Sequence, residues 1–295
     1  MESYNFSITG TNHKDNGQEN QDFIISSSND KFELIILADG VSTCSKAKEG
    51  AEVAAKAIET LFLKKGDWFI KCEDDKQRTE LILGHVLREL QDRAKADGVP
   101  VEEYSSTLAA VLREKKTNKL LTFNLGNSLI MAIDDGKVRI LSSPSNTTHG
   151  TAVTTTRKAE SLADTKVING TPKITSTQSD KDGNIITKPL YSYGSTPLYE
   201  NIVICSDGAW EEMFYRGKLI PEISALLVNK QFDTIKEFLE KKNPFDDCSF
   251  VALDLNKMKY AMQDGISSAD ELETIGREMY ESEQQSYENN SGLKR

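Results

Sequence analysis

Three apolar runs of strand length each stand beside an aspartate, and this arrangement constrains the fold more than any other feature of the chain. Asp39 follows the run at 34–38, Asp207 follows that at 202–206, and Asp246 precedes that at 249–253. Short, continuous apolar runs are typical of buried β-strands, so each carboxylate stands at the end of a rigid element. Three carboxylates brought together repel one another unless a cation lies among them, and hard divalent cations prefer oxygen ligands. The pattern predicts a metal-dependent enzyme.

The composition excludes several other classes of protein. A chain of 295 residues makes one large domain or two small ones, and its net charge of −10 argues against a nucleic-acid partner. No apolar run is long enough to span a membrane, and the polar residues 1–11 lack the core of a signal peptide. The four cysteines show no zinc-binding spacing. We therefore expect reduced thiols, no membrane partner and a cytoplasmic location.

The order of the expected elements indicates mixed layers of helices and strands. Strands come first, then two helices, several strands, two more helices and a last strand, without the regular alternation of a doubly wound sheet. The expected strands are 5–8, 22–27, 32–38, 106–112, 120–125, 129–133, 137–141, 201–206 and 250–255, and the expected helices are 47–64, one through 81–90 that ends near 97, 223–228 and 235–239. The sequence Asp134-Asp135-Gly136 predicts a hairpin turn.

Two segments differ in composition from the rest. Residues 143–195 are rich in Thr, Ser, Asn and Gly and are expected to form a surface excursion, with an edge strand at Thr154–Thr156 and a turn at Asp182–Asn184. Residues 259–295 carry a net charge of −4. Their apolar residues recur at helical spacing from Ile266 to Met279, which predicts a short helix followed by a disordered end. We therefore divide the chain into a domain at 1–258 and an acidic C-terminal extension.

Six short motifs occur in a fixed order along the chain: Gly10-Thr11-Asn12-His13, Asn20-Gln21-Asp22, Ala38-Asp39-Gly40, Gly126-Asn127-Ser128, Ser206-Asp207-Gly208 and Asp246-Asp247-Cys248-Ser249. An isolated Asp-Gly is usually a turn, so the specificity lies in the ordered set rather than in any one motif. The set resembles the motifs of the type 2C metal-dependent serine/threonine protein phosphatases. The resemblance covers residues 5 to 256 and includes the opening motif of a bacterial branch of that family.

The resemblance implies an α+β fold, a four-layer α-β-β-α sandwich of two antiparallel sheets flanked by helical pairs. It also implies roles for individual residues around two Mg²⁺ or Mn²⁺ ions. Asp39 would bridge the two ions, and the carbonyl of Gly40 would bind the second. Asp207 and Asp246 would complete the shell of the first, and Asp22 would act through ordered water. Asp247 is expected to be a structural neighbour rather than a ligand.

The implied activity is the hydrolysis of phosphoserine and phosphothreonine in proteins by a water molecule activated by two metals. The expected partners are a phosphorylated protein substrate and a cognate serine/threonine kinase. Two alternatives remain at this point. The chain could be a pseudophosphatase that uses the fold as an interaction module, or a phosphatase of a small phosphorylated metabolite.

The chain also departs from the family pattern around the substrate. Gly17 and Gln18 stand where many members carry an arginine that clamps the phosphate, so this contact would fall to His13 or Lys14. Val41 stands where some relatives carry a histidine thought to act as general acid, and protonation of the leaving group would fall to metal-bound water or to His13. We therefore include His13 among the catalytic candidates. Asn127, in place of an aspartate, should weaken or remove a third metal site.

Overall fold

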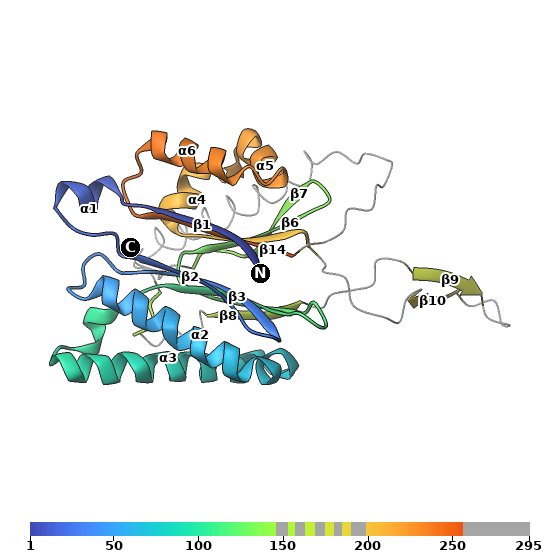
Figure 1. Ribbon diagram of the computed structural model, residues 1–295, viewed down its shortest axis with the longest axis horizontal. Coiled ribbons are helices and arrows are strands. Elements are labelled where there is room, and N and C mark those ends of the chain that lie inside the picture. The colour runs from blue at the N-terminus through green and yellow to red at the C-terminus, as the bar shows by residue number, and fades with distance from the viewer. Residues whose placement is uncertain (146–152, 157–162, 169–174, 180–184, 190–198, 256–295) are drawn as a thin grey trace, which may run out of the picture.

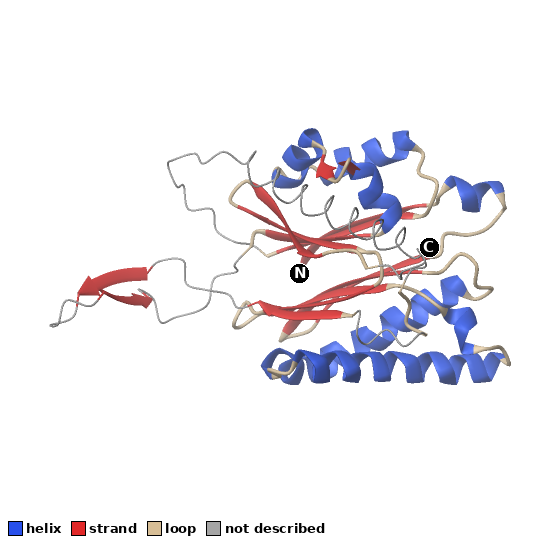
Figure 2. Ribbon diagram, turned by 180° about the vertical axis from the view of Figure 1, so that it is seen from behind, coloured by secondary structure: helices blue, strands red, loops and turns tan. Residues whose placement is uncertain are grey.

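Two five-stranded sheets stack face to face and carry helices on their outer surfaces (Figures 1 and 2). This computed structural model describes residues 1–145, 153–156, 163–168, 175–179, 185–189 and 199–255. Neighbouring strands in both sheets run antiparallel throughout the described residues. The expected four-layer α-β-β-α sandwich is therefore confirmed.

The two sheets have the strand orders β1-β14-β11-β6-β7 and β2-β3-β4-β5-β8. The strands of the first sheet are β1 (Glu2–Ile8), β14 (Cys248–Asp254), β11 (Asn201–Cys205), β6 (Leu129–Asp134) and β7 (Lys137–Ser142). Those of the second are β2 (Asp22–Ser28), β3 (Phe32–Asp39), β4 (Leu108–Glu114), β5 (Leu120–Leu125) and β8 (Asp164–Ile168).

Each sheet is covered on its outer face by a pair of helices (Figure 1). The second sheet is covered by α2 (Ala47–Lys71) and α3 (Asp75–Asp97), and the first by α5 (Pro221–Val228) and α6 (Phe232–Lys242). The short elements are α1 (Thr11–Asp15), η1 (Val101–Tyr104) and α4 (Asp207–Met213), together with the two-stranded pairs β9 (Thr175–Ser179) with β10 (Ile185–Pro189) and β12 (Phe214–Tyr215) with β13 (Lys218–Leu219).

Strand β3 is apolar without interruption from residue 34 to 38 because both of its faces are buried there. Leu34 and Ile36 belong to the core between the second sheet and its helices, whereas Ile35 and Leu37 belong to the core between the two sheets. All four side chains are fully buried. A strand between two packed layers has no solvent face, so polar residues do not alternate along it. The aspartate at its end is therefore fixed by a rigid element.

Most of the expected elements are present, and several differ from expectation. Helix α2 continues beyond the expected end at residue 64 to Lys71, and α1 and α4 were not expected as helices. Thr154–Thr156 do not form an edge strand; Thr154 and Thr155 are buried, and Thr155 donates one backbone hydrogen bond to Ser106. A single bond of this kind cannot build a strand ladder.

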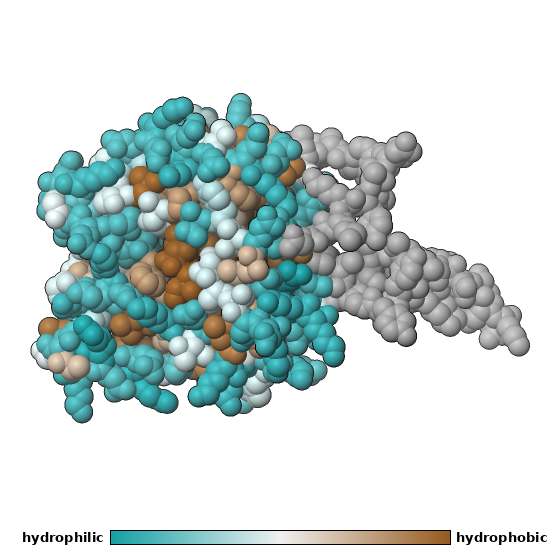
Figure 3. Space-filling model, viewed as in Figure 1, coloured by the Kyte–Doolittle hydropathy of each residue, from teal (hydrophilic) through white to brown (hydrophobic). Residues whose placement is uncertain are grey.

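The remaining expectations concern turns, the C-terminal extension and the surface. The hairpin turn is confirmed, because Asp135 and Gly136 both have positive φ between β6 and β7. The turn at 182–184 and the extension at 259–295 lie outside the described residues. None of the helices in the described ranges is long and apolar enough to cross a bilayer. The face in Figure 3 is mostly hydrophilic, and its apolar residues gather where the two sheets meet.

Candidate metal centre

Four carboxylates converge at one end of the sandwich, where neighbouring strands begin and end. Asp22 opens β2 and lies directly opposite Asp39, the last residue of β3. Asp207 follows β11 as the first residue of α4, and Asp246 lies two residues before β14. Because β11 and β14 are antiparallel neighbours, the end of one lies beside the start of the other. Residues far apart in sequence therefore share one site.

The electrostatics of the cluster show how close these carboxylates lie. Burial raises the pKa of Asp39 well above its ordinary value, and the negative charges of Asp22, Asp207 and Asp246 raise it further. The side chains of Asp39 and Asp207 are within hydrogen-bonding reach of each other. Burial, followed by repulsion from Asp246, also raises the pKa of Asp207. The cluster is unfavourable as a set of bare anions and favours a cationic occupant.

Asp22 gives the clearest test of whether a metal fits. It is 9% exposed, and neither carboxylate oxygen has a hydrogen-bond partner among the described residues. Burial raises its pKa well above the ordinary value; the nearby hydroxyls of Ser249 and Ser206 act in the opposite direction. Those hydroxyls donate elsewhere, to Ser7 Oγ at 2.7 Å and to the Asp247 carbonyl at 3.2 Å. A buried carboxylate without partners fits a site for hard cations or their bound water.

Gly40 brings its backbone against the start of α2. A Cβ at this position would lie 2.6 Å from the carbonyl oxygen of Ala47, so only glycine allows this approach. The Gly40 amide donates to the carbonyl of Gln21 at 3.2 Å, which ties the end of β3 to the start of β2. The backbone beside Asp39 is thereby held in place, as a carbonyl ligand requires.

The loop that carries Asp246 is held between two glycines. A Cβ on Gly10 would lie 2.4 Å from the Asp246 carbonyl carbon, and one on Gly208 would lie 2.3 Å from the Asp247 carbonyl oxygen. The amides of Thr11 and Asn12 donate to the carbonyls of residues 244 and 245. Segments that follow β1 and β11 thus fix the loop on two sides.

Asp247 anchors this loop from inside the protein. Its carboxylate accepts hydrogen bonds from the amide of Gly10 at 2.8 Å and the amide of Gln21 at 2.6 Å, and it pairs with His13 Nδ1 at 2.8 Å. The residue is 2% exposed. All three partners lie in the segment between β1 and β2. These contacts favour the structural role expected for Asp247 and show how it positions Asp246.

His13 and Lys14 are adjacent on α1 but lie in different environments. His13 is 1% exposed, and its Nε2 is buried without a partner among the described residues. Lys14 is exposed. The structure therefore places His13 inside the protein beside Asp247 rather than on an open substrate surface. Gly17, which stands where the family resemblance would place an arginine, is exposed and has φ of +64°.

Asn127 lies directly beside the cluster. Its Nδ2 donates a hydrogen bond to Asp207 Oδ2, and its carbonyl accepts one from Trp210 Nε1 at 2.8 Å. Trp210 lies on α4, one turn after Asp207. The amide thus supplies a neutral donor to Asp207 where a carboxylate would add a negative charge.

The sequence did not predict the anchoring role of Ser206, whose hydroxyl also accepts from the amide of Ser249 at 2.8 Å.

A second acidic group, Asp134, Asp135 and Glu200, has carboxylate oxygens within 4.8 Å of one another. Glu200 precedes β11, whereas Asp207 follows it. This group is therefore at the opposite end of the strand from the predicted site.

Solved structures of bacterial phosphatases share this fold. A bacterial serine phosphatase has a TM-score of 0.60 at 15% identity, covering 88% of this chain and 100% of that one. The serine/threonine phosphatase Stp1 from Staphylococcus aureus has a TM-score of 0.57 at 14% identity, covering 86% and 94%. The S. agalactiae serine/threonine phosphatase has a TM-score of 0.55 at 15% identity, covering 85% and 98%. At these identities the likeness shows the fold.

Sequence comparison identifies the family. A search of curated protein sequences finds no significant match. The model of the family described as protein phosphatase 2C matches residues 9–241, which include Asp22, Asp39 and Asp207 and end five residues before Asp246. Together with the sandwich fold and the acidic cluster at its end, this match over most of the chain shows that the protein belongs to the protein phosphatase 2C family.

Proposed function

We propose that the protein hydrolyses phosphoserine and phosphothreonine in other proteins and depends on Mg²⁺ or Mn²⁺. Its family supports a protein phosphatase activity. The observation that carries the metal dependence is the cluster of Asp22, which is buried, with Asp39, Asp207 and Asp246, which are partly buried; its members repel one another as bare anions. Repulsion within such a cluster lowers the stability of the fold. Unfavourable local arrangements of this kind are expected mainly at functional sites, so the cluster supports a catalytic centre.

Each residue of the cluster has a distinct part in the proposal. The charges of the other three carboxylates all act on Asp39, so Asp39 and the Gly40 carbonyl beside it would hold both ions. Asp207 and Asp246 would hold the first ion, and Asp22 would orient its water. Two bound divalent ions would supply an activated water molecule and neutralise charge on the phosphoryl group. No nucleophilic side chain of the protein is required.

Lys14 is the side chain that we assign to the phosphate. Many family members use an arginine here, and the two candidates in this chain are His13 and Lys14. His13 is buried and paired with Asp247, whereas Lys14 is exposed on the same helix. An exposed ammonium group supplies a point charge for a dianionic phosphate. His13 acts instead through Asp247, as a positioning residue for the loop that carries Asp246.

The decisive experiment measures phosphate release from a phosphoserine peptide with Mn²⁺, with Mg²⁺ and in chelator. We expect activity only with a divalent ion and a loss of more than about 100-fold in Asp39→Asn, since even partners outside the metal shell cost about 10–100-fold. Lys14→Ala should raise KM by about 1.4- to 5-fold, because an exposed charge contact contributes about 0.2–1 kcal/mol. Lys95→Ala, which changes an exposed lysine on α3, should leave KM unchanged.

Each alternative function gives a different result in the same experiment. Activity that persists in chelator contradicts the proposed mechanism. Divalent-ion binding by calorimetry without turnover on any phosphopeptide supports an interaction module. Turnover on phosphorylated metabolites but on no phosphoprotein supports a metabolic phosphatase.

A further inference from the structure

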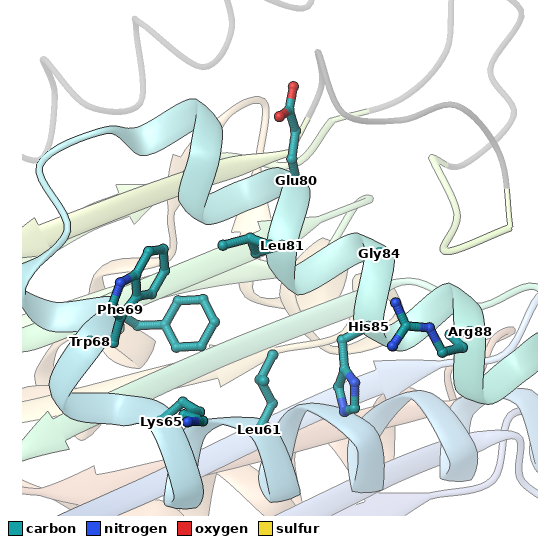
Figure 4. A pocket seen from close by; sticks show the side chains of 9 residues that line it. All are labelled: Leu61, Lys65, Trp68, Phe69, Glu80, Leu81, Gly84, His85 and Arg88. Atoms are coloured by element: carbon teal, nitrogen blue, oxygen red, sulfur yellow. The ribbon is translucent and has the colours of Figure 1, made fainter.

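An apolar hollow of the surface lies between α2 and α3. It has a volume of about 440 Å³ and lies between the second half of α2 and the first half of α3 (Figure 4). Leu61, Phe69 and Leu81 line it with hydrocarbon, and Trp68 stands beside Phe69 with the ring centroids 5.0 Å apart. Trp68 is 41% exposed and Leu81 is 49% exposed. This α2–α3 groove therefore leaves large apolar side chains in contact with solvent.

Gly84 enlarges the groove from the side of α3. A Cβ at this position would have no heavy atom within 4 Å, so the fold does not require glycine there. Glycine in a helix interior is less favourable than alanine. The missing side chain keeps the wall of α3 open between Leu81 and His85, as Figure 4 shows. An occupant that packs against the backbone of α3 would explain why glycine stands at position 84.

The rim of the groove is basic. Lys65 and Arg88 both line it and both are exposed. Neither makes an ion pair with another residue in the ranges that the structure describes. The acidic Glu80 points away from the apolar floor (Figure 4). The groove thus combines a hydrocarbon floor with positive charge at its edge, which suits an amphipathic helix with acidic flanks.

We propose that residues 266–279 of the same chain dock into the α2–α3 groove as an amphipathic helix. The apolar residues Ile266, Ala269, Leu272, Ile275 and Met279 fall on one face at helical spacing. Asp270 and Glu271 lie at the two edges of that face, so they are placed to meet Lys65 and Arg88. The segment carries four acidic residues and one basic residue, and its charge is opposite to that of the rim.

The described chain ends at the same end of the sandwich as the groove. Asp254 pairs with Glu2, and the amino group of Met1 lies 3.7 Å from Glu33 Oε1 at the start of β3. Lys31, at the turn between β2 and β3, bonds to Asp67 Oδ2 at 2.7 Å. Asp67 directly precedes Trp68 on α2. These contacts lead step by step from the end of β14 to the groove.

The length of the connecting segment is sufficient. Residues 256–265 supply ten residues, which span about 33 Å when extended. The path crosses one sheet and one layer of helices, each about 10 Å thick. The C-terminal extension can therefore reach the groove without leaving its own molecule.

Hydrogen exchange of the full chain tests the proposal. We expect amides of residues 266–279 to exchange at least tenfold more slowly than an unstructured chain. Leu272→Asp removes the centre of the apolar face. Gly84→Lys places a long side chain at the wall of the groove, where its Cβ meets no heavy atom within 4 Å. Either change should abolish the protection. Thr274→Asp adds the same charge on the opposite face of the segment and should preserve it.

A second pair of variants tests the contribution of the rim. Lys65→Glu should weaken the protection of residues 266–279, whereas Lys64→Glu, which changes the adjacent exposed lysine outside the groove, should not. Exchange of β3 amides in every variant shows that the fold is intact. The proposal is overturned if residues 266–279 exchange freely in the unmodified protein, if protection survives Gly84→Lys, or if it appears only at high protein concentration, which indicates a second copy as the occupant.

Discussion

The imidazole of His13 and the carboxylate of Asp247 form a buried pair, with 2.8 Å between Nδ1 and Oδ2. The two residues are 234 positions apart, and each is at most 2% exposed. The same carboxylate accepts two backbone amides from the segment between β1 and β2. Asp246, its neighbour in sequence, is thereby tied to the segment that leads into β2, whose first residue is Asp22. The pair links two parts of the candidate metal centre that separate strands supply.

We expect His13→Ala to destabilise the protein by about 1–3 kcal/mol, because a buried carboxylate loses a hydrogen-bond partner. Affinity for divalent ions should fall by about 10–100-fold, as it does when partners outside a metal's ligand shell are removed. Denaturant unfolding and calorimetry measure the two effects. Lys14→Ala, on the same helix but exposed, is the control and should unfold like the original protein. An unchanged unfolding midpoint in His13→Ala would show that the pair contributes little.

The metal-free protein should become less stable as the pH rises from the acid range. Asp22, Asp39 and Asp207 have folded-state pKa values raised above the ordinary 3.8, chiefly by burial. Such groups stabilise the fold while protonated, below pH 3.8, and this contribution is lost as the pH rises through the raised pKa values. Divalent ions offset the repulsion of the ionised forms. Mg²⁺ or Mn²⁺ should therefore raise Tm more at pH 8 than at pH 5, as measured by thermal unfolding with and without chelator; an equal rise at both would contradict this account.

Asp39→Asn should affect the stability of the metal-free protein differently from the stabilisation that Mg²⁺ provides. Removing one charge relieves repulsion from the neighbouring carboxylates, so the Tm measured in chelator should rise or stay unchanged. The increase in Tm on adding Mg²⁺ should shrink, because a metal ligand is lost. Asp92→Asn removes an exposed charge on α3 and should alter neither quantity. A lower Tm in chelator for Asp39→Asn would mean that this carboxylate stabilises the fold by itself.

Gly208→Ala should weaken the metal centre by displacing the loop behind it. The new Cβ would meet the Asp247 carbonyl oxygen at 2.3 Å, and overpacking of this kind costs about 1–3 kcal/mol. Gly84→Ala is the matched control, since its Cβ meets no atom within 4 Å and alanine is favoured in a helix interior by about 0.8–1 kcal/mol. Thermal unfolding of both variants should give shifts of opposite sign. Equal shifts would show that the loop moves aside freely.

Asn127→Asp should introduce a further charge beside Asp207. The side chain would lose the donor that now bonds Asp207 Oδ2 and add repulsion, so the metal-free protein should lose about 1–3 kcal/mol of stability. In return, calorimetry should detect one additional weak divalent-ion site, because a carboxylate is a stronger ligand than an amide. Asn127→Ser, which adds no charge, should not create that site. An unchanged number of bound ions in Asn127→Asp would exclude the position as a ligand.

Much of the fold could be predicted because burial dictates the residue pattern. The run at 34–38 could be identified as a strand since both of its faces are covered. The end of α2 could not, because Lys64, Lys65 and Gly66 look like a helix terminus. In the structure Gly66 is buried against Phe32, and a Cβ at position 66 would lie 2.8 Å from the ring. This tertiary contact stabilises the helix beyond residue 64, although glycine is unfavourable in a helix interior. Thr154–Thr156 have strand propensity but only one backbone bond to Ser106.

The sequence by itself determined which residues could bind a metal, because Asp39, Asp207 and Asp246 stand at recognisable strand boundaries in a specific order. Only the tertiary structure decided how the surrounding residues are used. His13 and Lys14 are adjacent basic residues, and both were candidates for the phosphate contact. In the structure His13 is buried and Lys14 is exposed. Their difference depends on Asp247, which strand pairing between β1 and β14 brings to α1. Local propensity carries no information about a partner more than two hundred residues away, so burial and pairing had to come from the fold.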